Sequence, residues 1–165
     1  MKYSITFYTY WHCGSGLSGG SSNDALVVRD AEKLPFVPGK TVKGHLRDIA
    51  TQLGLEPFIT NCFGVEDSDM GACFFGDAVV EEKIEHSRYL YETLASTKID
   101  EQIGVAVDDT LRSIEVVVPL TLYGEVLGCS EEMLETLSDL MARVKHIGMR
   151  RHRGLGRCDI KMEGA

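Results

Sequence analysis

The sequence predicts an α+β fold, because strand-like and helix-like hydrophobic patterns follow one another in the order strand, helix, strand, strand, helix, strand. The chain has 165 residues, of which 44% are hydrophobic and 25% are charged. These proportions are typical of a globular protein, and the length is sufficient for one hydrophobic core. We therefore expect a single domain over residues 1–165 that needs neither a metal ion nor a disulfide for stability.

One strand and one helix are expected in the first third of the chain. Residues 2–10 alternate apolar and polar side chains, as a half-buried strand does. A polar, glycine-rich loop follows from His12 to Asn23. We then expect Thr41 to cap a helix that Gly54 ends, in which apolar residues recur every three or four positions: Val42, Leu46, Ile49, Ala50 and Leu53.

The rest of the chain is expected to supply three strands and a second helix. Residues 72–80 and 114–126 have strand-like composition, and Pro119 predicts that the second of these strands is at an edge or bulged. The polar residues 81–112 between them are interpreted as a helix followed by a hairpin. Ser130 is expected to cap a helix whose apolar face continues to Ile147, and residues 158–162 alternate again as a closing strand.

This order of elements is that of a ferredoxin-like (RRM-like) βαββαβ fold. It consists of an antiparallel sheet with two helices on one face, and here it carries loop insertions. Sheets of this type often bind single-stranded RNA.

Positive charge is concentrated near the end of the chain. The formal net charge is −8, with 17 Lys and Arg against 25 Asp and Glu. Residues 143–157 contain six of these cations and no acid, which leaves 11 cations against 25 acids elsewhere, a balance of −14. Arginine forks and the exposed N–H groups of glycine-rich turns bind phosphates. We therefore expect this segment to bind a polyanion such as RNA, through Arg150, Arg151, Arg153, Gly154, Gly156 and Arg157.

A second basic group lies on the predicted first helix. Lys43 and Arg47 share one face of this helix, and the Pro38-Gly39 turn before it presents Lys40 near its start, so the three are candidates for contact with a nucleic-acid backbone. The same spacing also fits a solvated helix face. His12, in the glycine-rich loop, is a further candidate for phosphate contact or acid–base chemistry.

The candidate catalytic groups are carboxylates. Asp24 follows an uncharged part of the glycine-rich loop, and Asp108 and Asp109 form a second acidic pair. A carboxylate can bind a hard cation such as Mg²⁺ or move a proton, but a single acid is also common as a turn or cap residue. The spacing of His and Cys does not fit a zinc site.

The sequence predicts a cytoplasmic protein with no membrane contact. No apolar run approaches the roughly 20 residues of a membrane-spanning helix. The first residues have a strand pattern and not the pattern of a signal peptide. The five cysteines are odd in number and widely separated, which favours free thiols.

Four parts of the chain resemble motifs of the RAMP superfamily, the repeat-associated proteins of CRISPR interference complexes. Residues 34–47 resemble its Pro-Gly-(Ser)-Ser-Leu-Lys-Gly-x-x-Arg segment, and residues 61–64 with 74–78 resemble its Leu-Phe-Gly and x-Asp-Ala pair. Residues 98–115 resemble its Ile-Asp-Arg-x-Thr-Gly hairpin, and residues 153–157 resemble its terminal glycine-rich loop. The chain is most similar to the backbone subunit that cuts target RNA in type III complexes.

The resemblance implies a metal-dependent endoribonuclease that binds guide RNA and cleaves bound single-stranded target RNA. Residues 27–30 match the apolar-apolar-Arg-Asp stretch that follows the catalytic acid of the family, so the implied catalytic residue is Asp24. The implied cofactor is Mg²⁺ or another divalent cation. The implied partners are the two RNAs and other subunits of an antiviral CRISPR ribonucleoprotein complex, with a homo-oligomeric filament as one mode of assembly.

Two other functions remain open at this point. The chain could be a non-catalytic RNA-binding scaffold of the same superfamily, in which Asp24 only shapes its loop. It could also be an unrelated ferredoxin-like enzyme that acts on a small phosphorylated ligand.

Overall fold

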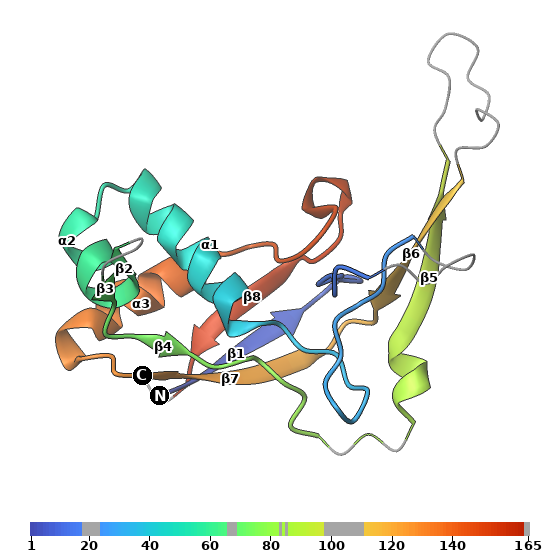
Figure 1. Ribbon diagram of the computed structural model, residues 1–165, viewed down its shortest axis with the longest axis horizontal. Helices are drawn as coiled ribbons and strands as arrows, with labels where there is room; N and C mark the ends of the chain where they lie inside the picture. The colour runs from blue at the N-terminus through green and yellow to red at the C-terminus, as the bar shows by residue number, and fades with distance from the viewer. Residues whose placement is uncertain (18–23, 66–68, 83, 85, 98–110, 164–165) are drawn as a thin grey trace, which may run out of the picture.

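The computed structural model (Figure 1) describes residues 1–17, 24–65, 69–82, 84, 86–97 and 111–163. Its centre is a sheet of β1 (Lys2–Phe7), β4 (Phe74–Phe75), β7 (Thr121–Leu127) and β8 (Cys158–Met162). These strands lie in the order β4-β7-β1-β8, and each neighbouring pair is antiparallel. The first and third of them along the chain therefore lie in the middle, as in a ferredoxin-like fold, and the predicted fold class is confirmed.

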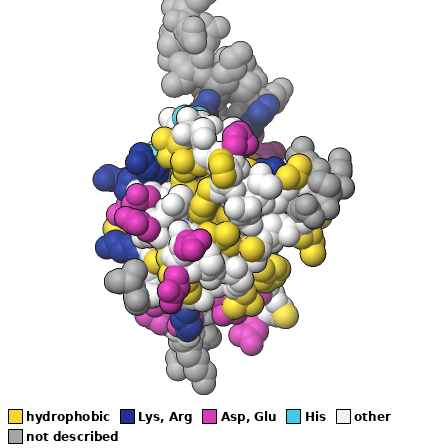
Figure 2. Space-filling view, turned by 90° about the vertical axis from the view of Figure 1, so that its left-hand side faces the viewer, with side chains coloured by type: hydrophobic (Ala, Val, Ile, Leu, Met, Phe, Trp, Pro, Cys, Tyr) yellow, Lys and Arg dark blue, Asp and Glu magenta, His cyan; other side chains and the backbone are white. Residues whose placement is uncertain are grey.

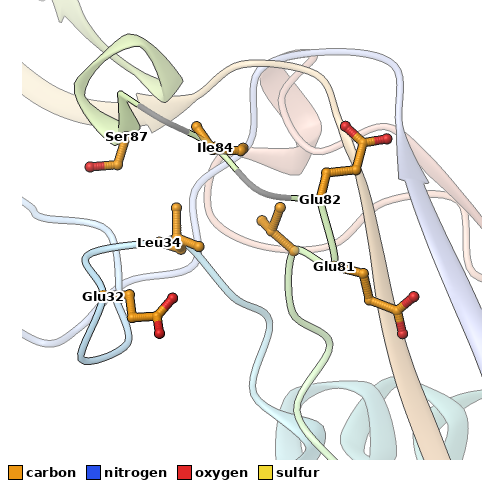
Figure 3. Close-up of a pocket in the computed structure, with 7 residues that line it drawn as sticks. Glu32, Leu34, Glu81, Glu82, Ile84 and Ser87 are labelled. Carbon is orange, nitrogen blue, oxygen red and sulfur yellow. The ribbon is translucent and has the colours of Figure 1, made fainter.

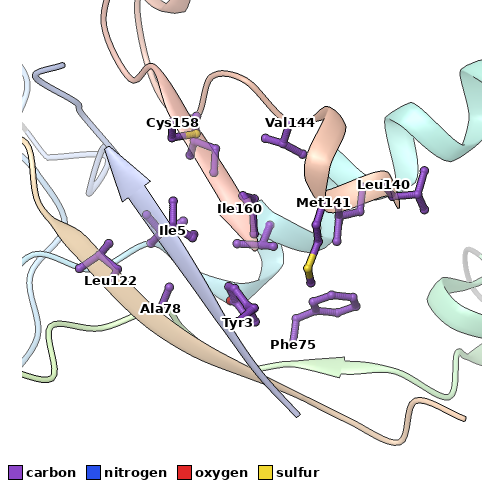
Figure 4. Packing of buried hydrophobic residues seen from close by; sticks show 14 of the residues in the cluster. Tyr3, Ile5, Phe75, Ala78, Leu122, Leu140, Met141, Val144, Cys158 and Ile160 are labelled. Carbon is purple, nitrogen blue, oxygen red and sulfur yellow. The ribbon is translucent and has the colours of Figure 1, made fainter. Parts of the chain in front are cut away.

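Helices α1 (Gly39–Gln52) and α3 (Glu131–Arg143) cover one face of this sheet. Strand alternation places Tyr3, Ile5 and Phe7 of β1 on the covered face, where each is at most 2% exposed. Figure 4 shows these strands packing against the helices through a core that includes Phe75, Leu122, Leu140, Met141 and Ile160. Burial of apolar surface, worth about 25 cal/mol per Å², holds the helices on the sheet.

Helix α1 begins three residues earlier than predicted. Pro38, and not Thr41, occupies the N-cap position, and no side chain of the capping residue makes a cap hydrogen bond. Instead, Gly39 N donates a hydrogen bond to Asp77 Oδ1 at 2.8 Å. A carboxylate from elsewhere in the chain therefore accepts the hydrogen bond of a free N–H group in the first turn of the helix. The local sequence could not reveal this contact.

The expected long strand over residues 114–126 is wrong, because Pro119 separates two strands with different partners. Strand β6 (Arg112–Val117) pairs with β5 (Tyr91–Ser96), whereas β7 pairs with β1 and β4. The predicted hairpin in residues 81–112 is therefore present as β5 and the start of β6. The helix predicted before it is only the 3-10 turn η2 (Ser87–Leu90).

The β5–β6 hairpin extends away from one end of the four-stranded sheet (Figure 1). The opposite end carries short elements that the sequence did not predict: α2 (Glu56–Phe58), the π-helix η1 (Ile59–Phe63), β2 (Gly64–Val65) and β3 (Asp69–Met70). In the parts of the chain that the structure describes, no helix is long and apolar enough to cross a membrane. The predicted free thiols are confirmed for all five cysteines.

Candidate nucleic-acid interface

The arginine-rich segment forms a loop, residues 148–157, that is anchored at its base and exposed at its tip. At the base, Ile147 N donates to Gly156 O at 2.9 Å, and Gly156 N donates to Tyr10 O at 2.7 Å. The tip is the short 3-10 turn η3 (Arg151–Arg153), whose three side chains are exposed. This arginine loop therefore presents Arg151 and Arg153 to solvent from a backbone that is held at both ends.

The arginine loop connects helix α1 with the β5–β6 hairpin. Arg151 Nη1 lies 3.5 Å from His45 Nδ1 on α1, and Arg150 Nη1 donates to Ser96 Oγ on β5 at 3.0 Å. Partial burial, and then the charge of Arg151, lower the pKa of His45. His45 and Ser96 are contacts that sequence reasoning missed, because only the tertiary fold brings them to the loop.

The predicted basic face of α1 does not join this loop. Lys43 and Arg47 are each two residues from His45, so they project about 160° away from it around the helix. Lys43 instead acts on η1, at the far end of the molecule. Burial raises the pKa of the Cys62 thiol there, and the charge of Lys43 opposes that rise. Lys40 is exposed in the first turn. The structure thus separates the predicted cations into two groups on different flanks of α1.

Arg157 also lies apart from the exposed tip of the loop. The hydroxyl of Tyr8 donates to Asp159 on β8 at 3.0 Å, and this bond raises the pKa of Tyr8. The charge of Arg157 opposes that rise, which places Arg157 on the same side as Tyr8. These residues belong to the sheet face that the helices leave uncovered. That face carries the ion pairs Lys2–Glu81 and Lys145–Asp159. Its charges are mixed, so it lacks the basic surface that would favour RNA binding across the sheet itself.

Asp24 is attached to the edge of β6 that faces away from β5. Its backbone N donates to Ser113 O, and its Oδ2 accepts a hydrogen bond from Ser113 N, both at 2.8 Å. The side chain is exposed, and its Oδ1 makes no hydrogen bond to another described residue. Asp24 can therefore offer one oxygen to a ligand while the other fixes the orientation of the carboxylate.

Asp24 and Arg150 contact the β5–β6 hairpin at about the same level along its length, through different strands. Asp24 binds Ser113, which pairs with Ala95, and Arg150 binds Ser96, which is the next residue of β5. Successive residues of a strand are about 3.3 Å apart along its axis, and Asp24 lies two strand spacings of about 4.8 Å from β5. A carboxylate and a guanidinium are thus held by the same section of one hairpin.

The proposed contact of His12 with phosphate is wrong for this structure. The imidazole is 0% exposed, and its Nδ1 lies 2.6 Å from Glu115 O. Its Nε2 is buried without a hydrogen-bond partner among the described residues. His12 therefore belongs to the core under the hairpin, although the polar sequence around it resembles a surface loop. Asp108, Asp109 and residues 18–23 lie outside the described residues.

The two glycines of the arginine loop differ in their surroundings. Gly154 is exposed, with a φ of 84° and open space where a Cβ would lie. Gly156 is buried, with a φ of 70°, and a Cβ there would lie 2.0 Å from Ile147 O. The prediction that Gly156 contacts RNA is therefore replaced by a role in packing the base of the loop.

Replacing Gly156 with alanine should lower the melting temperature by about 5–15 °C, because the new methyl group must displace the backbone of Ile147. Gly154→Ala is the matched control: it meets the same unfavourable sign of φ without a collision, so its effect should be about 1 kcal/mol. Thermal unfolding of both variants measures the difference. Equal melting temperatures would contradict the packing role of Gly156.

Two surface pockets have linings that do not suit a phosphorylated ligand. One, of about 450 Å³, is lined by Glu32, Glu81 and Glu82 together with apolar residues such as Leu34 and Ile84 (Figure 3). The other, of about 300 Å³, includes Asp77, Glu81 and Glu125 and a single cation, Lys2. Carboxylates repel phosphate. These pockets therefore give no support to an enzyme that acts on a small phosphorylated molecule.

The described residues fit a divalent ion only in a site shared with RNA. They contain no group of three or more His, Cys, Asp or Glu that could hold a metal. Mg²⁺ is nevertheless often held by one or two carboxylates together with substrate phosphates and water. The exposed carboxylate of Asp24 fits that arrangement and does not fit a cage made of protein ligands.

Solved structures share this fold. A chain of the type III-B Cmr-beta complex bound to cognate target RNA has a TM-score of 0.75 at 12% identity, covering 97% of this chain and 95% of that chain. A chain of the apo Cmr-beta complex has a TM-score of 0.78 at 13% identity, covering 99% and 96%. No curated protein matches the sequence. The family model of the RAMP superfamily matches residues 4–159, and the chain therefore belongs to the RAMP superfamily.

Proposed function

We propose that the chain is an RNA-binding backbone subunit of a type III CRISPR effector complex and that it cleaves bound target RNA at Asp24. The observation that carries this proposal is that an exposed carboxylate, Asp24, and the arginine loop are both attached to the β5–β6 hairpin at the same level along its length. The similarity to Cmr-beta chains supports the kind of complex, because one of those complexes is bound to its cognate target RNA.

The arginine loop would hold RNA through its phosphates. Arg151 and Arg153 are exposed and free of ion pairs to described residues, so their charges are available to a polyanion. Such contacts position RNA without reading its sequence, which suits a subunit whose specificity comes from guide RNA. Lys40, Lys43 and Arg47 would contact a separate stretch of the RNA path.

Asp24 would orient or deprotonate a ribose 2′-hydroxyl for attack on the adjacent phosphate, which forms a 2′,3′-cyclic phosphate as the P–O5′ bond breaks and the leaving 5′-oxygen takes a proton from water. The hydrogen bond from Ser113 N holds Oδ2, which leaves Oδ1 for the hydroxyl or for a cation. A bound divalent ion would offset the charge that develops on the phosphate. Arg150 would supply a fixed positive charge from β5, since its single bond to Ser96 leaves other guanidinium N–H groups available.

The end of the molecule away from the β5–β6 hairpin has a surface suited to contact with other protein subunits. Figure 2 shows hydrophobic side chains over this end. The exposed residues there include Val65, Met70, Phe74 and Leu127, with Met70 99% exposed. Groups of exposed apolar residues mark protein contacts. This end would therefore contact neighbouring subunits, including further copies of this chain in a filament.

One observation favours the alternative of a non-catalytic scaffold. Asp24 makes two hydrogen bonds with Ser113, and these attach the end of the glycine-rich loop to β6 whether or not any reaction occurs. In that case the chain would bind guide and target RNA but would not cut the target.

Purification of the chain with an affinity tag from its own cells tests the proposed complex. We expect it to co-purify with short RNAs of uniform length that carry CRISPR repeat sequence, together with several other proteins. Sequencing of the bound RNA and mass spectrometry of the proteins provide the measurement. A tagged chain that is recovered free of both RNA and other proteins would contradict the proposal.

A further inference from the structure

We propose that Glu115, a buried carboxylate of β6, is a positioning residue that sets the location of Asp24 for cleavage. This inference rests on the proposed function and deepens it. Glu115 is only 8% exposed, and with His12 it is one of two buried polar or charged residues in the described part of the chain. A buried charge is costly unless it is paired and hydrogen-bonded, so its contacts need an explanation.

The polar groups of Glu115 bind both ends of the segment that leads to Asp24. At the first residue of the glycine-rich loop, His12 Nδ1 lies 2.6 Å from Glu115 O. After it, Glu115 N donates to Ala25 O at 3.1 Å, and Glu115 Oε2 accepts a hydrogen bond from Val27 N at 3.0 Å. One residue thus holds the chain at the start of the loop and just after its end.

The second carboxylate oxygen extends this attachment to the hairpin. Glu115 Oε1 accepts a hydrogen bond from Arg29 Nη2 at 2.5 Å. The guanidinium of Arg29 lies over the ring of Tyr91 on β5, 3.8 Å from its centroid. Tyr91 in turn donates to Lys33 O at 2.8 Å. Residues 24–33 are therefore held to both strands of the hairpin, and the Glu115 carboxylate is the central acceptor.

The carboxylate is required because two donors converge on it. An ionised side chain accepts from Val27 N and Arg29 Nη2 at the same time, whereas a glutamine must present its NH₂ group to one of them. That contact would become repulsive, and the segment that carries Asp24 would shift along β6. Misplacement of a reacting group by about 1 Å costs on the order of 100-fold in rate.

The test is a single-turnover cleavage assay of the assembled, guide-loaded complex with a labelled, guide-matched target RNA. We expect Glu115→Gln to slow cleavage by about 10–100-fold, while the Kd for target RNA stays within about 3-fold of the native value because Glu115 is buried and cannot touch RNA. The variant should also need more Mg²⁺ for half-maximal rate, since a displaced Asp24 holds the ion less well. Glu92→Gln is the matched control, because Glu92 is an exposed carboxylate on β5 and its loss should leave the rate unchanged.

Arg29→Gln provides a second route if Glu115→Gln fails to assemble, because it removes the other half of the same ion pair. It should show the same loss of rate with unchanged affinity. Combining Glu115→Gln with Asp24→Ala should slow cleavage no further than Asp24→Ala alone, as expected for residues that act through one group.

Two results would overturn the inference. A rate within about 2-fold of native for Glu115→Gln would show that Asp24 does not depend on it, and a parallel fall in affinity and rate would show a general structural role. In both cases an inactive Asp24→Ala complex would leave the proposed function standing. Undiminished cleavage by Asp24→Ala would instead remove the proposed function itself.

Discussion

Replacing Arg151 and Arg153 together with alanine should weaken single-stranded RNA binding by about 10-fold or more at low salt, equally for all RNA sequences. Both side chains are exposed at the tip of the arginine loop, on a molecule whose net charge is −8. Loss of two phosphate contacts should also reduce the log–log dependence of affinity on salt by a slope of about 1.4, or roughly 0.7 for each phosphate. Fluorescence anisotropy over a salt series measures both quantities.

A double variant with the same loss of charge elsewhere is the control for this result. Arg143 is exposed at the end of α3, and Lys161 is exposed on the uncovered face of the sheet. Replacing this pair with alanine should change affinity much less than the loop variant does. If both pairs had equal effects, overall charge would explain binding, and a changed sequence preference in the loop variant would indicate base contacts.

Much of the fold could be predicted from the sequence because its elements are defined by local periodicity. The closing strand and α3 follow from alternating residues and a wide apolar face, and both are present. The errors occur where contacts between residues distant in the sequence determine where an element begins or ends. Asp77 fixes the start of α1, and Pro119 lies where the chain leaves one sheet for another, so neither feature could be read from neighbouring residues.

The candidate site was predictable only in part, because a sequence shows which residues are charged but not which part of the fold each side chain faces. The exposed tip of the arginine loop is where clustered arginines predicted it. Arg157 lies beside Tyr8 on the other side, and His12 is buried, although both looked equivalent to the loop residues in sequence. Glu115 gave no signal within its apolar strand, since its importance arises from Val27 and Arg29, which meet it only in the folded chain.

Replacing Asp24 with alanine should abolish target cleavage, with a loss of at least about 100-fold in rate, and leave the Kd for RNA within a few-fold. An exposed carboxylate near phosphates repels the bound RNA in its ground state, so its removal should not weaken binding. The transition state, in contrast, loses the group that orients the attacking hydroxyl or holds the divalent ion.

Two further variants separate the chemistry of Asp24 from its structural contact. Asp24→Asn can still accept the hydrogen bond from Ser113 N but carries no charge, so it should be as inactive as the alanine variant. Glu135→Ala removes an exposed acid from α3 and should cleave normally. An active asparagine variant would indicate that only the attachment to β6 matters.

The most direct test of the central claim compares single-turnover cleavage of guide-matched target RNA by native and Asp24→Ala complexes, each with Mg²⁺ and with EDTA. The account predicts cut RNA only for the native complex with Mg²⁺, and bound but intact RNA in the other three reactions. Undiminished cutting by the Asp24→Ala complex would contradict the catalytic assignment and leave a scaffold that binds RNA without cleaving it.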